Sequence, residues 1–457
     1  MEKPSSSRRK SSTKVKASTD ANTNLSMLNE DLLQNILARL PALHFASAAC
    51  VSKSWNSLCN RILTRPKLSS AISLNPSLPD AVNEVVHKVL SEPIRPHFAI
   101  ANIGTGFSTA KTLCLIRQSL GSNIPVIVTV ASGIMGRDAV TDEFKEEASS
   151  DMKLVLEKLD HAMPMDTVIV GDERGSFDFV HKSGNDSRII CSKKGNIEAV
   201  ALVFARDRNR SLGTIRFHVA LSNGVSTVGP RYKAASVKSN NADCSTWLTA
   251  RREGQQENLD GQSILLDINN LLDNHVESPD LHIGVIKHRK LSTGAEKPMP
   301  RTCISYHGVV GGDEEYLYVD GIGIKTGDFF QFYYSDPNIA LASLTKVHDA
   351  LKSIKLEKKS KSSKGDGDNA TNVFGGIIFA CYSRGESFFG RQNVDSSPFL
   401  ENFPGVPVSG IFCGGEMVRP CTTVIGQCEG ASPISCCLHV YSTVYLAMSY
   451  TPPSVED

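Results

Sequence analysis

The chain has 457 residues, of which 49 are Lys or Arg and 48 are Asp or Glu, so its formal net charge is +1. A nearly neutral chain argues against a protein that holds nucleic acid or an anionic membrane through its overall charge. With 40% hydrophobic residues the chain is too apolar to be disordered throughout, and at about 150 residues per domain its length predicts two to four domains. It contains no run of about 18 apolar residues, so no membrane span is predicted.

Residues 1–23 are predicted to form a disordered basic tail. The first twenty residues hold six cationic and two acidic side chains, a net charge of +4, and no apolar segment. They therefore do not resemble a secretory signal, and we expect the protein in the cytoplasm, the nucleus or both. The cluster Arg8–Arg9–Lys10 fits a solvated tail or a nuclear import signal, and the sequence leaves both open.

The twelve cysteines are expected to be thiols, because a reducing compartment does not maintain disulfides. No pair has the C-x-x-C spacing, and Cys413, Cys421, Cys428 and Cys436 lie too far apart for a zinc site. We therefore predict no metal site and no cofactor, and interpret most cysteines as small buried side chains.

Residues 24–66 are predicted to form three short helices. Asn29 is a suitable N-cap for the first helix, Pro41 ends it, and Ser52 caps the third. Three helices in about forty residues enclose too little volume to bury all their apolar side chains. Part of the apolar face must therefore contact another surface, either the rest of this chain or a partner protein.

The segment LNEDLLQNILARLPALHFASAACVSKSWNSLC closely resembles the F-box motif, with Asn29 where the family usually has Pro. The resemblance implies docking on the Skp-type adaptor of a Skp–cullin–F-box (SCF) ubiquitin ligase, and through it on a cullin and a RING subunit. The adaptor-binding residues that it implies are Leu28, Leu32, Leu33, Ile36, Leu37, Leu40, Pro41, Val51, Trp55 and Leu58.

The remainder is predicted to be an α/β (α+β) region with mixed sheets, so the fold class is a small all-α domain followed by a large mixed one. A connector over residues 67–94 precedes two parts, 95–290 and 300–450, and residues 356–371 read as a mobile loop within the second part. A helix is expected at about Asp80–Leu90 in the connector, and a strand–helix–strand opening from Phe98. No fixed-period repeat is present, which argues against a leucine-rich solenoid.

The second part resembles the FIST domain, a module shared by sensory and F-box proteins. The resemblance rests on Phe379-x-Cys381-x-x-Arg384-Gly385 and on Pro407-Val408-x-Gly410 followed by Gly415-Glu416. Residues 95–290 match more loosely. The resemblance implies a non-catalytic receptor that captures unknown target proteins for polyubiquitination and proteasomal degradation, and it covers plant proteins labelled F-box/LRR without obvious repeats.

Candidate ligand or target loops follow two of the predicted strands and contain Cys381, Arg384, Gly385, Gly415 and Glu416. An Arg and a carboxylate could bind the two ends of an amino acid, which would make the FIST region a small-ligand sensor; the alternative is a structural salt bridge between the loops. Cys381 is interpreted as a buried thiol, with a reactive thiol as the alternative. The role of Trp247 is left open. No motif supports an autonomous enzyme.

Overall fold

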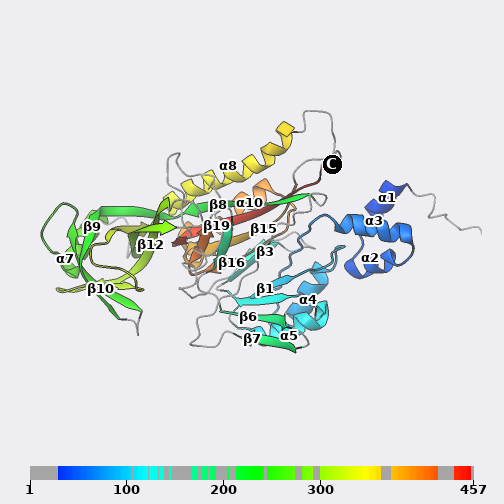
Figure 1. Cartoon of the computed structure of the whole chain (residues 1–457), viewed down its shortest axis with the longest axis horizontal. Coiled ribbons are helices and arrows are strands. Elements are labelled where there is room, and N and C mark those ends of the chain that lie inside the picture. Colours follow the sequence, from blue (N-terminus) through cyan, green and yellow to red (C-terminus); the bar gives the residue numbers. More distant parts are fainter. Residues whose placement is uncertain are drawn as a thin grey trace, which may run out of the picture.

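The computed structural model describes residues 29–104, 106–121, 123–131, 133–137, 144–146, 167–172, 176–183, 186–191, 204, 213–240, 244–272, 280–291, 299–361, 372–419 and 437–453. Three regions follow one another along the long axis of the molecule (Figure 1). A helical block lies at one end, mixed sheets with covering helices lie in the middle, and a β-barrel lies at the other end.

The helical block consists of α1 (Glu30–Leu37), α2 (Ala42–Ala49) and α3 (Lys53–Leu63). The side chain of Asn29 accepts a hydrogen bond from the backbone N–H of Asp31 at 3.1 Å, and Ser52 Oγ accepts one from the N–H of Trp55 at 3.1 Å. Both predicted caps are confirmed, and they satisfy N–H groups that the helix itself leaves without acceptors.

The connector folds back on itself and bonds to the helical block. Helix α4 (Leu78–Val89) begins two residues before the predicted start, and the segment preceding it bonds back onto the helix. Lys67 forms a 2.5 Å salt bridge with Glu92, and Ser69 Oγ donates to the carbonyl of Val89 at 3.3 Å. Where α2 begins, the N–H of Ala42 donates to the carbonyl of Leu90 at 2.9 Å.

The predicted strand–helix–strand opening is confirmed. Strands β1 (Ala99–Ile103) and β2 (Val126–Val130) pair in parallel, with α5 (Thr109–Leu120) between them in the chain. Strands β6 (Ser176–Ser183) and β7 (Asp186–Cys191) extend this sheet in the order β1-β2-β6-β7. Its core contains Leu113, Val126 and Val128.

The central sheet has six strands in the order β4-β3-β16-β15-β19-β8. They are β4 (Phe144–Glu146), β3 (Gly133–Arg137), β16 (Val408–Cys413), β15 (Asn372–Cys381), β19 (Ser442–Thr451) and β8 (Thr214–Asn223). Helices α8 (Pro337–Lys361) and α10 (Ser397–Asn402) contribute Val347, Leu351 and Phe399 to the core above it (Figure 1). Since α8 runs to Lys361, residues 356–361 are helical, and the prediction of a loop from 356 was wrong for them.

A smaller sheet of three strands lies beside the central one, in the order β18-β17-β5. It consists of β18 (Cys437–His439), β17 (Glu416–Arg419) and β5 (Ile169–Asp172). Val418 of β17 packs with Val444 and Leu446 of β19, so the two sheets share a hydrophobic cluster.

The β-barrel closes in the order β10-β13-β12-β11-β14-β9. Its strands are β9 (Val225–Asn240), β10 (Ser245–Arg252), β11 (Leu281–Leu291), β12 (Met299–Gly312), β13 (Leu317–Asp320) and β14 (Phe329–Ser335), and α7 (Gly261–Leu272) packs against it. Side chains fill the interior, among them Tyr232, Leu248, Phe330 and Phe332. Alternating inward and outward residues follow from the two-residue period of a strand.

The barrel is an insertion between β8 and α8 of the central region. Its chain enters after Gly224 and leaves before Asp336, and the N–H of Asp336 donates to the carbonyl of Gly224 at 2.9 Å. The predicted boundary at 290–300 therefore falls between β11 and β12, which are adjacent partners in one barrel. A short polar stretch with Gly and Pro is as typical of a connection between paired strands as of a linker between domains.

Among the described residues, no helix is both long and apolar enough to cross a membrane. Within the same ranges, no group of three or more His, Cys, Asp or Glu side chains is arranged to hold a metal ion.

Candidate functional site: the apolar face of the helical block

The apolar stripe of the helical block divides into a buried and an exposed half. Leu33 and Leu37 of α1 lie in a core with Phe45, Ala48, Leu58 and Cys59. Leu32 and Ile36, each one residue earlier, are 50% and 44% exposed. Successive residues of a helix differ by 100° around its axis, so neighbouring leucines lie on different faces.

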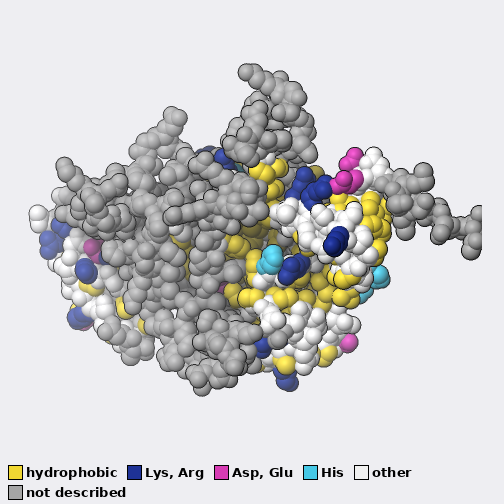
Figure 2. Space-filling view, turned by 45° about the vertical axis from the view of Figure 1, so that its right-hand side comes forward, with side chains coloured by type: hydrophobic (Ala, Val, Ile, Leu, Met, Phe, Trp, Pro, Cys, Tyr) yellow, Lys and Arg dark blue, Asp and Glu magenta, His cyan; other side chains and the backbone are white. Residues whose placement is uncertain are grey.

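Two further large apolar side chains are exposed on the same block. Leu43 in the first turn of α2 is 74% exposed, and Val51 between α2 and α3 is 64% exposed. We call Leu32, Ile36, Leu43 and Val51 the exposed apolar set. Figure 2 shows hydrophobic side chains gathered along the outer side of this block. Contiguous exposed apolar surface on a folded domain typically marks a binding site for another protein.

The structure sorts the predicted adaptor-binding residues by their position. Leu33, Leu37 and Leu58 are core residues, which support the helices from within. Leu40 and Trp55 are partly buried against that core, whereas Pro41 is exposed between α1 and α2. Leu28 lies outside the described residues. Leu43 was not among the predicted contacts, although a large apolar residue two positions after Pro41 was the available signal.

Comparison with known proteins supports this location of the site. The F-box domain family matches residues 25–65. The chain is also similar to an F-box/LRR-repeat protein of Arabidopsis thaliana, at 42% identity over 93% of this chain and 94% of that protein. The chain therefore belongs to the family of F-box proteins. F-box domains bind Skp1-type adaptors, and F-box proteins are in general non-catalytic substrate receptors.

The word LRR in the relative's name does not describe the architecture found here. Leucine-rich repeats stack strand units of 20–29 residues into a horseshoe. Among the described strands, only β1 with β2 and β15 with β16 pair in parallel; every other pairing between named strands is antiparallel. The described sheets and the closed barrel are therefore not a stack of repeats.

The second predicted site lies where the parallel strands β15 and β16 end. Cys381 and Cys413 are register partners at these ends, Arg384 lies in the short 3-10 helix η3 (Tyr382–Arg384), and Glu416 is the first residue of β17. Gly385 and Gly415 adjoin Arg384 and Glu416 in the chain. The prediction that these segments follow successive strands is confirmed. The prediction that Glu416 lies in a loop was wrong, because Glu416 is part of strand β17.

Arg384 is almost completely buried and forms a bidentate ion pair. Its Nη2 lies 2.7 Å from Asp395 Oδ1, and its Nε donates to Asp395 Oδ2 at 3.2 Å. The remaining donors bond Ser222 Oγ and the carbonyl of Tyr441, each at 2.9 Å. Ser222 lies on β8, and Tyr441 directly precedes β19. One guanidinium thus bonds to three segments that lie 11 (Asp395), 57 (Tyr441) and 162 (Ser222) residues from it in the chain. No local pattern around Arg384 points to Asp395, Ser222 or Tyr441 as its partners, because all three are distant in the chain.

Glu416 is fully buried, and its carboxyl group has partners of its own. Glu416 Oε2 accepts a hydrogen bond from Ser442 Oγ at 2.7 Å, and Oε1 lies 3.6 Å from Cys413 Sγ. Burial raises the pKa of Glu416 to about 8, because the low-dielectric interior penalises the carboxylate more than the bonds from Ser442 stabilise it. The salt bridge of Arg384 is formed with Asp395, not with Glu416.

The thiols of this cluster are protonated and shielded. Burial and the charge of Glu416 raise the pKa of Cys381 far above its ordinary value, and burial also raises that of Cys413. A nucleophilic cysteine needs a lowered pKa and access to solvent, and Cys381 has neither. An amino acid would need Arg384 and Glu416 at a surface, whereas both are enclosed and bonded within the chain. This cluster is arranged to hold strands together.

Proposed function

We propose that this protein is the substrate-recognition subunit of an SCF ubiquitin ligase. Its helical block docks on a Skp-type adaptor, which connects it to the cullin and the RING subunit. The remainder captures target proteins for polyubiquitination and proteasomal degradation. The observation behind this proposal is the exposed apolar set on a three-helix block that the F-box family matches.

The exposed apolar set has the composition of a protein interface. Large aliphatic side chains at the centre of an interface gain free energy when water leaves them, at about 25 cal/mol per Å² of apolar surface. A standard interface covers about 800 Å² on each partner, and a few side chains near its centre supply most of the binding energy. The buried half of the stripe holds the helices in place, so that the exposed half can be presented without rearrangement.

Target capture is assigned to the region beyond the connector, which we propose to be a FIST region. Its support is the sequence motif around Cys381 and Arg384 and the 42% identity that extends through this region to another F-box protein. The connector contacts both of its neighbours: the N–H of Ala42 in the F-box donates to the carbonyl of Leu90, and Val82 of α4 packs in one hydrophobic cluster with Leu113 and Val126. A stiff connection of this kind would hold a bound target at a fixed position relative to the adaptor.

Adaptor binding is the test, with variants that separate the two halves of the stripe. The full chain is immobilised and its dissociation constant for a Skp-type adaptor is measured. Leu32→Ala combined with Ile36→Ala should weaken adaptor binding at least tenfold, because truncation of a central interface residue costs more than about 1 kcal/mol. The thermal unfolding midpoint should stay nearly unchanged, because both side chains are about half exposed.

Leu33→Ala is the matched control on the same helix. It should destabilise the helical block by about 2–5 kcal/mol, because Leu33 is buried. Any effect on adaptor binding should follow the loss of folded protein. Adaptor affinity that is unchanged in the Leu32/Ile36 variant would contradict the proposed docking mode.

A further inference from the structure

The barrel exposes one of the two tryptophans of the chain. Trp247 lies on β10, where the side chains alternate between the barrel interior and the outside. Its neighbours Thr246 and Leu248 point inward and are completely buried, whereas Trp247 is 39% exposed. Because Trp247 faces away from the barrel core, its exposed indole ring is apolar surface that a partner could cover.

Trp247 belongs to an aromatic row that it forms with Tyr318 of β13 and with Tyr316, which directly precedes that strand. In the register of the barrel, Trp247 pairs with Lys238 of β9 on one side and with Tyr318 of β13 on the other. The rings of Trp247 and Tyr318 meet edge to face with their centres 5.7 Å apart. The centre of the Tyr316 ring lies 6.4 Å from the centre of the Trp247 ring. On the other side of Tyr318, its register partner on β12 is Gly311. The space beside Gly311 is open, so no side chain covers Tyr318 from this strand.

An acidic turn borders this row. Asp313, Glu314 and Glu315 precede β13 and are all exposed. Asp313 accepts hydrogen bonds from the N–H groups of Glu315 and Tyr316, at 2.8 and 2.7 Å, and from the hydroxyl of Tyr318. The turn is thereby fixed beside the aromatic rings, with the two glutamates projecting from it.

The charge of this surface is unbalanced. Among the described residues named here, Lys238 is the cation that faces the three carboxylates. Its Nζ donates to Tyr316 Oη at 2.6 Å and lies 4.4 Å from the centre of that ring. Within the part of the chain that the structure describes, neither Glu314 nor Glu315 forms a salt bridge. The surface thus combines exposed aromatic rings with carboxylates that are available to a cation.

We propose that this surface, formed by Trp247, Tyr316, Tyr318, Glu314 and Glu315, docks a segment of the target protein that carries Lys or Arg beside an aromatic or large aliphatic side chain. The apolar side chain would pack on Trp247, and the cations would meet the glutamates and the aromatic faces. Trp and Tyr are the residue types that most often dominate binding energy at interfaces. The acidic turn disfavours nucleic acid, whose phosphates it would repel.

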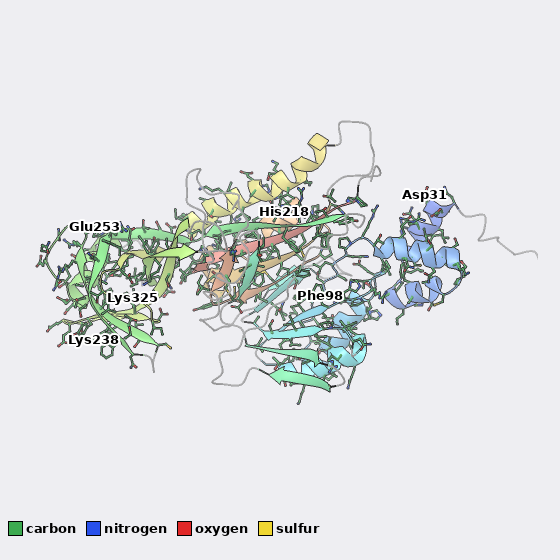
Figure 3. The ribbon with its side chains drawn as sticks, viewed as in Figure 1. Asp31, Phe98, His218, Lys238, Glu253 and Lys325 are labelled. Carbon is green, nitrogen blue, oxygen red and sulfur yellow. The ribbon has the colours of Figure 1, made fainter. Side chains whose placement is uncertain are left out.

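The inference rests on the proposed function, because it names the surface through which a target would be captured. The position of the surface is compatible with simultaneous adaptor binding. Figure 3 shows Lys238 at the barrel end of the molecule and Asp31 of α1 at the opposite end. A bound adaptor at the helical block would leave the aromatic row free.

The test uses the full chain in complex with a Skp-type adaptor and three fluorescein-labelled peptides, SGKKFKKGS, SGEEFEEGS and SGKKAKKGS. Binding is followed by fluorescence anisotropy. The first peptide should bind, and the other two should bind at least tenfold more weakly, because one lacks the cations and the other the apolar anchor. Affinity for the first peptide should fall with added salt, since the glutamates lie at the surface.

Two variants identify the surface and a third is the control. Trp247→Ala should weaken binding of SGKKFKKGS at least tenfold. Glu314→Gln combined with Glu315→Gln should weaken it about two- to fivefold and reduce its salt dependence, without a change in the thermal unfolding midpoint. Glu253→Gln, an exposed acidic position elsewhere on the barrel (Figure 3), should leave binding unchanged.

Equal binding of the basic and acidic peptides, or no binding of SGKKFKKGS, would overturn the proposal. A third result would also overturn it: Trp247→Ala lowers the thermal unfolding midpoint, and the Glu314→Gln/Glu315→Gln variant binds the peptide as tightly as the wild type. The aromatic row would then serve only to stabilise the barrel. Peptide binding by a chain that does not bind the adaptor would contradict the proposed function, whereas loss of peptide binding with the adaptor bound would contradict only this inference.

Discussion

The ion pair between Arg384 and Asp395 leads to a prediction in which two apparently equivalent substitutions differ. Arg384→Met removes the cation and keeps much of the side-chain volume, whereas Asp395→Asn removes the anion and keeps the shape. Both side chains are at least 95% buried, so each substitution leaves the charge of the other partner in the interior. Loss of one partner of a buried pair costs about 3–5 kcal/mol, a large share of the 5–15 kcal/mol that stabilises a typical domain.

The two remaining charges differ in their ability to be neutralised. In Arg384→Met, Asp395 can take up a proton, and burial already raises its pKa in the wild type. Without the cation, the folded-state pKa of Asp395 rises further above its unfolded value of about 4. The folded variant then binds a proton that the unfolded chain releases above pH 4, so its stability falls as the pH rises. In Asp395→Asn, Arg384 stays charged at every accessible pH.

We therefore expect Arg384→Met to be less destabilising at pH 5.5 than at pH 8.0, and Asp395→Asn to be equally destabilising at both. The measurement is urea-induced unfolding of the full chain, followed by circular dichroism, for the wild type, both variants and the double variant. The double variant should be more stable than Asp395→Asn, because no charge remains buried. Costs below about 1 kcal/mol for both single variants, or the opposite pH dependence, would refute this account of the pair.

Three further predictions concern other positions. Burial raises the pKa of Glu416 from 4.5 to about 8, so its contribution to folding stability is full below pH 4.5 and is lost as the pH approaches 8. Relative to Glu416→Gln, the unfolding free energy of the wild type should therefore fall by up to about 1.4 kcal/mol per pH unit between these values. Parallel curves of stability against pH for the two proteins would contradict this. Ser52→Ala removes the N-cap of α3 and should cost about 0.5–2 kcal/mol in thermal unfolding, with Ser54→Ala, an exposed position inside the helix, as the near-neutral control. Gly375→Ala places a Cβ 2.6 Å from Leu68 Cδ2 and should cost about 1–3 kcal/mol, part of which Leu68→Ala should restore; an unchanged unfolding midpoint would show that this contact is not tight.

Local chemistry made the helical block predictable. Asn29 and Ser52 cap helices through bonds to residues two and three positions on, and Pro41 separates α1 from α2, so a short window of sequence contains the whole interaction. The division of the leucines was harder to foresee. Leu32 and Leu33 have the same side chain and adjacent positions, and the packing of α1 against α2 and α3 decides which of them is buried.

The region beyond the connector was predictable in its elements and not in its assembly. Strands and the opening βαβ unit follow from residue patterns, but the insertion of the barrel between β8 and α8 depends on pairings such as β8 with β19, more than 200 residues apart. The same distance hid the partners of Arg384, since Ser222 lies 162 residues before it. The pattern predicted an Arg and a Glu in neighbouring segments, and packing decided that each would be enclosed with a different partner.

The central claim is that the exposed apolar set binds the adaptor, and alkylation of Cys50 tests it most directly. Cys50 is exposed and adjoins Val51, while Cys114 and Cys244 are exposed far from the helical block in the sequence. Alkylation rates of all three thiols are measured by mass spectrometry with and without saturating Skp-type adaptor. We predict that the adaptor slows alkylation of Cys50 at least about tenfold, as expected for a side chain enclosed by an interface, and leaves the other two unchanged. An unchanged rate at Cys50, with the adaptor shown to be bound, would contradict the account.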